Sequence, residues 1–185
     1  MQNKISFFTL IAGLFLASCN SGTTEQQAND DATSTEQSVG QSGVKDETSA
    51  PNIVQVASGS KDHTTLVAAV KAAELVDALS NAGPFTVFAP TNAAFDKLPA
   101  GTVEGLLKPE KKADLQGILE YHTYVGNLKI EYMNEGQEYQ TVNGASIKIT
   151  KVGDKVMVNG KATIIATIPT ANGIIHVIDE VLLPK

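Results

Sequence analysis

The sequence predicts an α+β fold for residues 51–185, with helices in the first half of this segment and short strands in the second. Up to His122, apolar residues recur at the three- and four-residue spacing of helices. From Ser146 onward they alternate with polar residues, and Asn-Gly pairs, which accept the positive φ of tight hairpin turns, interrupt the pattern. Helices followed by a meander of strands favour an α+β arrangement over an alternating parallel one.

Helical segments are expected where this spacing lies between capping residues, glycines or prolines: 62–82, 93–97, 100–108 and 111–122. Asp62 can cap the first segment, and Gly83-Pro84 ends it because proline cannot continue a helix. The second segment is one helical turn that carries Phe95.

Strands are expected at one apolar run and at later alternating stretches. Residues 85–89 are short and apolar, as a buried strand requires, and a turn at residues 90–92 follows them. Residues 146–150 and 156–158 alternate between apolar and polar. The expected hairpin turns are Asn143-Gly144, Gly153-Asp154, Asn159-Gly160 and Asn172-Gly173.

Residues 1–18 are predicted to be a signal peptide. One positive charge, Lys4, precedes an apolar run at residues 7–17. As a helix this run spans roughly 16 Å, about half of a ~30 Å hydrocarbon core, which is typical of an export signal and too short for a membrane span.

The end of this leader, Leu16-Ala17-Ser18-Cys19, resembles the cleavage box of bacterial lipoproteins. The resemblance implies that Cys19 carries a diacylglycerol, that its new amino terminus is acylated, and that lipid anchors the protein to a membrane. Two or more acyl chains anchor stably, whereas one binds marginally. The expected location is the bacterial cell envelope, with the outer membrane favoured over the inner one. A plain export signal that borders a cysteine is the alternative.

Residues 19–50, which begin with Cys19, are predicted to be a disordered polar tether. The segment has no aromatic residue and no periodicity, so it cannot bury enough surface to offset the entropy of ordering. Six acidic residues and one lysine give it most of the chain's net charge of −6. A flexible coil of this length spans about 30 Å, which would lift the domain clear of lipid headgroups. Alternatively, Asp30-Asp31 belong to a surface-export signal.

Composition excludes several classes of protein. All basic residues are lysine, so the chain lacks arginine, the residue that best contacts phosphate and guanine. Because the chain is also acidic, a nucleic-acid partner is not expected. A single cysteine forms no internal disulfide. About 135 residues can bury a core large enough to fold without such cross-links.

No catalytic or cofactor signature is present, so we expect no enzyme, cofactor or metal site. Three histidines are far apart in sequence, and a three-histidine zinc site would need them to meet in space. His63 is expected to be exposed at a polar helix start. His122 and His176 lie in apolar stretches, where a hydrogen-bonded core histidine is expected.

Three stretches, in order, resemble the fasciclin-like domain family: Thr86–Phe95, Tyr121-His122 and Asn172–Pro184. The resemblance covers nearly all of residues 51–185. It implies a wedge of antiparallel strands with several short helices packed on one side and edge. The signature residues that it implies to be structural are Thr86, Phe88, Pro90, Thr91, Asn92, Phe95, Asn172, Gly173, His176 and Asp179.

The family resemblance also implies a binding role, because these domains are extracellular adhesion and matrix-interaction modules. In animal relatives the tyrosine-histidine region and an Asp-Ile pair contact integrins. Here Tyr121, His122 and Ile168 match those positions, while Thr167 replaces the acid, so an integrin contact is not expected. For His122 the favoured interpretation is a buried hydrogen-bonding post.

The leading hypothesis is therefore a lipid-anchored, non-enzymatic adhesion module that presents one monomeric domain to a protein or polysaccharide partner. Fold alone does not identify that partner. One alternative is an envelope-structural protein with only periplasmic partners. Another is a hydrolase or metal-dependent enzyme on the same scaffold.

Overall fold

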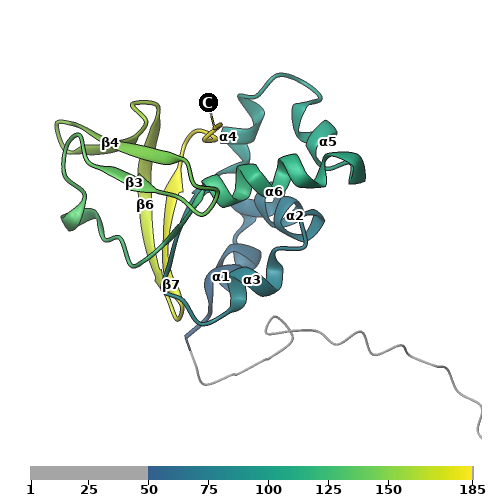
Figure 1. Cartoon of the computed structure of the whole chain (residues 1–185), viewed down its shortest axis with the longest axis horizontal. Coiled ribbons are helices and arrows are strands. Elements are labelled where there is room, and N and C mark those ends of the chain that lie inside the picture. Colours follow the sequence, from purple (N-terminus) through teal and green to yellow (C-terminus); the bar gives the residue numbers. More distant parts are fainter. Residues whose placement is uncertain (1–49, 185) are drawn as a thin grey trace, which may run out of the picture. The chain divides into compact units, whose positions relative to one another are not determined.

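The structure is a computed structural model that describes residues 50–184 (Figure 1). The predicted signal peptide and Cys19, with most of the predicted tether, lie outside the described residues. Within the described range, no helix has both the length and the apolar character needed to cross a membrane.

Short helices alternate with 3-10 turns through the first half of the domain. Their bounds are α1 Ile53–Gly59, η2 Lys61–His63, α2 Thr64–Ala72, α3 Val76–Ser80, α4 Asn92–Asp96, α5 Thr102–Leu106, η3 Pro109–Lys111, α6 Lys112–Tyr121 and η4 Ile130–Tyr132. Figure 1 shows α1 to α6 gathered on one side of the domain and β3, β4 and β6 on the other.

Seven strands form one mixed sheet in the order β2-β1-β7-β6-β5-β4-β3. Their bounds are β1 Phe85–Pro90, β2 Thr123–Val125, β3 Glu138–Gln140, β4 Ser146–Val152, β5 Lys155–Val158, β6 Ala162–Thr170 and β7 Gly173–Ile178. Neighbouring strands are antiparallel except for β1 and β7, which run parallel. The α+β class is confirmed, and the parallel pair is an addition to the antiparallel wedge. Residues 91–172, more than half of the described residues, intervene between β1 and β7, and a connection of this length can return the chain parallel to β1.

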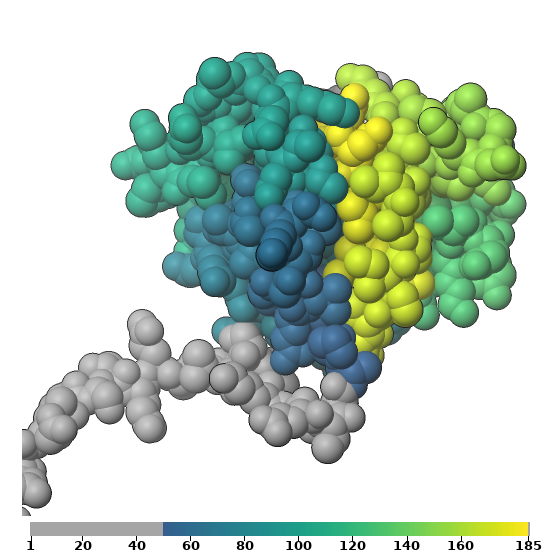
Figure 2. All heavy atoms as spheres, turned by 180° about the vertical axis from the view of Figure 1, so that it is seen from behind, coloured from purple at the N-terminus to yellow at the C-terminus, as the bar shows by residue number. Residues whose placement is uncertain are grey.

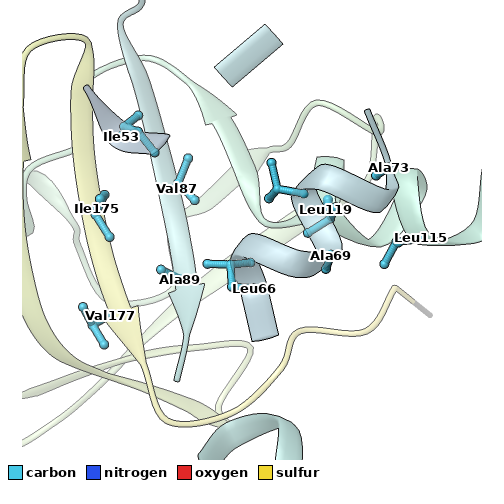
Figure 3. Packing of buried hydrophobic residues seen from close by; sticks show 11 residues of the cluster. Ile53, Leu66, Ala69, Ala73, Val87, Ala89, Leu115, Leu119, Ile175 and Val177 are labelled. Atoms are coloured by element: carbon cyan, nitrogen blue, oxygen red, sulfur yellow. The ribbon is translucent and has the colours of Figure 1, made fainter. Parts of the chain in front are cut away.

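The neighbouring strands β1 and β7 separate two hydrophobic cores. Val87 and Ala89 of β1 and Ile175 and Val177 of β7 face the helices, where Figure 3 shows them opposite Leu66, Ala69 and Leu119. Alternate residues of the same strands, such as Phe88 and Ile178, belong to the second core with Ile147, Ile149 and Val158. Because both faces are covered, every residue from Thr86 to Pro90 is buried.

The sheet curls until its two edges meet. Val142, just after β3, donates its N–H to the carbonyl oxygen of Thr123 in β2 at 2.9 Å. Thr86 Oγ1 donates to Gly126 O at 2.7 Å and accepts the N–H of Leu128 at 2.9 Å, which fixes the loop that follows β2. This curl encloses the second core.

One part of the sheet stays open, along β6. β5 pairs with β6 only at Ala162 and Thr163. Figure 2 shows residues of about 160–180 as a surface band between the helices and the side of the domain that carries β3 to β5. Pro169 pairs with β7 although it lacks an N–H, so its nitrogen faces the open edge. A proline at this position limits pairing with a further strand.

The helix expected at residues 62–82 is interrupted, which corrects that prediction. Ser60, not Asp62, caps the start, since its side chain accepts the N–H of Asp62. Glu74 then adopts a φ of +56°, and the N–H of Leu75 reaches Val70 O at 3.1 Å, so α2 ends in a Schellman motif. Glycine usually occupies this left-handed position, and a glutamate there gave no signal in the sequence.

Asn172 and Gly173 join the helices to the sheet. Asn172 Oδ1 accepts the N–H of Ile53 at the start of α1, and its Nδ2 donates to the carbonyls of Leu79 and Asn81 at the end of α3. A Cβ on Gly173 would lie 1.9 Å from the carbonyl oxygen of Phe85. Close backbone contact, at a nearly extended φ of 159°, is therefore what requires glycine here.

We expect Gly173→Ala to destabilise the domain by about 3 kcal/mol or more, because the paired backbones of β1 and β7 must separate. The matched control is Gly117→Ala in α6, where nothing lies within 4 Å of the added Cβ. The control should stabilise by up to about 1 kcal/mol through helix propensity. Urea unfolding of both variants measures the difference in their free energies of unfolding. Similar stabilities would contradict the close backbone contact between Gly173 and Phe85.

Candidate functional site

An open cleft of about 900 Å³ lies on the part of the chain that the structure describes. Residues of α4 and of the segment after β7 line one part, and residues of β3, β4 and the β5–β6 turn line another. Figure 1 shows the C-terminal end of the chain between β4 and α4, where these elements meet. A volume of this size is typical of ligand-binding sites.

Apolar and charged side chains enter the cleft from different elements. The apolar set comes from α4, the turn that follows it and the C-terminal segment: Ala94, Leu98, Val181 and Leu183. Most of the charged set comes from the strands and their flanking turns: Glu135, Glu138, Lys148 and Lys161. Lys97 and Glu180 complete it; they lie 3.9 Å apart, and Lys97 Nζ also donates to Asp179 O at 2.8 Å.

Three of these charges are available to a partner. Glu138 lies directly across from Lys148 in the β3–β4 register. Yet neither side chain, nor that of Lys161, forms an ion pair with another described residue. All three residues are exposed.

Tyr121 borders the cleft but is only 4 % exposed. Its hydroxyl donates to Ser146 O at 3.2 Å and accepts Asn159 Nδ2 at 3.0 Å. Asn159 Oδ1 in turn accepts the N–H of Lys148. Tyr121 therefore ties α6 to β4 and the β5–β6 turn, and a direct contact with a partner stays a prediction.

His122, the residue after α6, lines two apolar cavities of about 40 and 30 Å³. Nδ1 donates to Ile118 O at 2.8 Å, and Nε2 accepts the N–H of Leu182 at 3.0 Å, so the ring is neutral and holds the C-terminal segment. Burial lowers the pKa of His122 to about 4. These contacts agree with the expected buried post; its role toward a partner stays a prediction.

Ile168 packs against the helix-side core from β6, and Thr167 beside it contacts His176. His176 Nε2 donates to Leu128 O at 2.7 Å, so its Nδ1 accepts the Thr167 hydroxyl at 2.9 Å. Thr167, which replaces the aspartate of the Asp-Ile pair, thus has a hydrogen-bond partner within the domain, His176. Burial also lowers the pKa of His176.

His63 is buried, with 6 % exposure, and the expectation that it would be exposed is wrong. Its Nδ1 lies 2.8 Å from Ser60 Oγ. Burial lowers its pKa, and its Nε2 has no hydrogen-bond partner among the described residues. The missed element α1, which packs against η2 and α2, covers this part of the chain.

The remaining signature residues organise turns. Thr91 caps α4 by accepting the N–H of Ala94, while Asn92 accepts the N–H of Thr65 and donates to Lys61 O. Asp179 accepts the N–H of Thr163 at 2.7 Å, which fastens the end of β7 to β6. Pro90 ends β1 fully buried, and Phe95 is half-buried against the helix-side core.

The buried histidines and the acidic residues do not form a metal-binding group among the described residues. His122 and His176 are held by backbone carbonyls, and no group of three His, Cys, Asp or Glu side chains there could hold a metal ion. The cleft can instead make polar and apolar contacts. Sequence reasoning missed Lys148, Lys161 and Glu138 as site residues; the polar positions between Ile147 and Ile149 were the available signal.

Comparison with known proteins identifies similar chains. A family model described as the fasciclin domain matches residues 61–184. Protein sll1483 of Synechocystis is 52 % identical over 136 residues, which cover 74 % of this chain and 75 % of that protein. The cell surface glycolipoprotein MPB83 of Mycobacterium bovis is 43 % identical over 110 residues, 60 % of this chain and 48 % of MPB83.

A solved structure shows the same fold. The FAS1 domain pair from the insect cell adhesion molecule fasciclin I aligns with a TM-score of 0.62 and 19 % identity. The alignment covers 72 % of this chain and 51 % of that chain.

Acidification should destabilise the domain because the folded state holds His122 neutral. The unfolded state takes up this proton below its ordinary pKa of 6.5, whereas the folded state does so only near pH 4. The free energy of unfolding therefore falls progressively as the pH is lowered from 6.5 to about 4. His122 accounts for roughly 3 kcal/mol of this loss.

Urea midpoints between pH 7.5 and pH 4, followed by circular dichroism, measure this loss. His122→Gln should be less stable at pH 7.5 and should lose less stability on acidification than the unmodified protein. Equal pH dependence of the two proteins would contradict the assignment to His122.

Proposed function

The chain belongs to the fasciclin domain family, and we propose that it is a membrane-anchored binding module of the bacterial cell envelope. Homologues in this family are cell-surface and adhesion-type proteins. The proposed role is to present one domain outside the cytoplasm to a protein or polysaccharide partner. The proposed arrangement is a leader at residues 1–18, a tether at 19–50 and the binding domain at 51–185.

The observation that carries this proposal is the open cleft. It is large enough for a ligand, and it presents the charges of Glu138, Lys148 and Lys161 without internal partners among the described residues. Such side chains gain from pairing with a partner that excludes water from them. The buried histidines, by contrast, have hydrogen-bonding roles in the fold, which supports binding over catalysis.

Cys19 supplies the anchor in this proposal. Two or more acyl chains there would hold the protein to one membrane stably, and the outer membrane is the proposed one. The tether would then carry the domain away from the lipid surface. MPB83, which is named a cell surface glycolipoprotein, supports this arrangement.

Cys19→Ser should release the protein from the membrane, because the thiol that carries the lipid is lost. Fractionation of cells that produce each form, followed by immunoblotting, measures the release. The control is Ser21→Ala, next to the same site, which should stay with the membrane. Membrane retention of Cys19→Ser would contradict the lipid anchor.

Obstruction of the cleft should abolish partner binding. Ser146→Trp places a large side chain in the cleft, while the Ser146 carbonyl that holds Tyr121 stays in place. Lys155→Trp, exposed on the neighbouring strand and outside the cleft, is the control. Envelope material of the producing cells, separated into protein and polysaccharide fractions, serves as the probe.

Vesicles that carry the lipidated protein should bind one of the two fractions, and Ser146→Trp should weaken this binding at least tenfold. Lys155→Trp should leave it within twofold. Failure of the unmodified protein to bind either fraction would contradict the binding module. Equal binding by the Ser146→Trp protein would place the site elsewhere.

A further inference from the structure

We infer that the cleft takes an extended peptide segment of a partner protein, with side chains that alternate between apolar and charged. This inference rests on the proposed binding function and names the partner class at the same cleft. It follows from the separation of the apolar and charged lining residues onto different elements and from the charges without ion-pair partners among the described residues. It also follows from the lack of exposed aromatic residues in the described lining.

The apolar lining gives the first constraint. Leu183 is 49 % exposed, and Leu98, Val181 and Ala94 enter the same cleft. An apolar side chain placed against Leu183 would remove both from water, at about 25 cal/mol per Å² of apolar surface buried. The partner therefore needs apolar groups on the side that faces α4 and the C-terminal segment.

The charged lining gives the second constraint. Glu135 and Glu138 come from β3 and the turn before it, Lys148 comes from β4, and Lys161 comes from the β5–β6 turn. The lining carries both positive and negative charges, so a complementary ligand carries charges of both signs or polar backbone groups. A peptide in an extended conformation meets both constraints, since successive side chains point to opposite sides.

Hydrogen-bonding groups give the third constraint. The hydroxyls of Ser146 and Thr150 line the cleft without hydrogen-bond partners among the described residues. They lie on the same strand as Lys148 and can donate to and accept from the N–H and C=O groups that an extended peptide presents along its length.

The other polymers fit the cleft less well. A polysaccharide packs its sugar rings on exposed aromatic faces, and the one aromatic residue that borders the cleft, Tyr121, is 4 % exposed with its hydroxyl occupied. A nucleic acid needs an excess of positive charge, whereas the three lysines of the cleft are balanced by three glutamates.

The test pans a phage-displayed library of random 12-residue peptides against the immobilised full chain. Three further proteins are panned in parallel: Lys148→Glu/Lys161→Glu, Leu183→Asp, and the control Lys155→Glu, whose side chain lies outside the cleft. All substituted side chains are exposed, so melting temperatures should stay close to that of the unmodified protein.

Peptides selected on the unmodified protein should alternate apolar and charged residues. They should bind the double charge reversal and Leu183→Asp at least tenfold more weakly, and Lys155→Glu within twofold. Selection on the double reversal should shift the charged positions from acidic to basic. Enrichment of no peptide, or of peptides that bind all four proteins equally, would overturn the inference.

The vesicle experiment separates this inference from the binding module itself. Cleft-dependent binding to the polysaccharide fraction alone would overturn the peptide assignment and leave the binding module standing. Absence of binding to both fractions would contradict the binding module as well.

Discussion

The burial of the β1–β7 pair on both faces is the constraint on which the rest of the domain depends. Both faces of these two parallel strands are covered by a core, so each position must hold an apolar or a hydrogen-bonded side chain, and Val87 and Phe88, adjacent in sequence, serve different cores. The helices cover one face and the curled strands β3 to β6 enclose the other. The cleft opens where these two halves of the structure diverge.

The neutral histidines extend this constraint to the polar groups. His122 accepts the N–H of buried Leu182, and His176 donates to the carbonyl of buried Leu128, so these backbone groups have hydrogen-bond partners. Such rings fix the loop after β2 and the segment after β7 without a buried charge. At the cleft, the hydroxyl of Tyr121 is already hydrogen-bonded, and the free charges lie on exposed residues.

Local signals in the sequence predicted much of the fold. The strand at residues 85–89 and the helix at 111–122 follow from the apolar run and the helical periodicity, and they agree with the structure. The sequence also contained the Asn52 and Gln55 capping box of α1, which stayed unrecognised beside a polar tether.

What was missed depends on contacts between distant residues or on an unusual backbone conformation. The helix break at Glu74 needs a left-handed residue that is normally glycine, and the burial of His63 needs α1. The cleft is assembled from residues between Ala94 and Leu183 that meet only after the sheet has curled. No periodicity within one element encodes such a site. The alternation in β4 indicates only that Ser146, Lys148 and Thr150 share one polar face.

The attachment of the first helix to the β6–β7 hairpin has a mechanical consequence. Pro51 O accepts the N–H of Ala171, and Asn172 accepts that of Ile53, so a pull on the N-terminal segment is delivered to the start of β7. The cleft begins at the other end of this strand, with Glu180. Tension between an anchor and a bound partner would thus run lengthwise along β7. It would load the hydrogen bonds of β7 to β1 and β6 in shear and at the same time. Resistance to detachment would therefore depend on the whole strand.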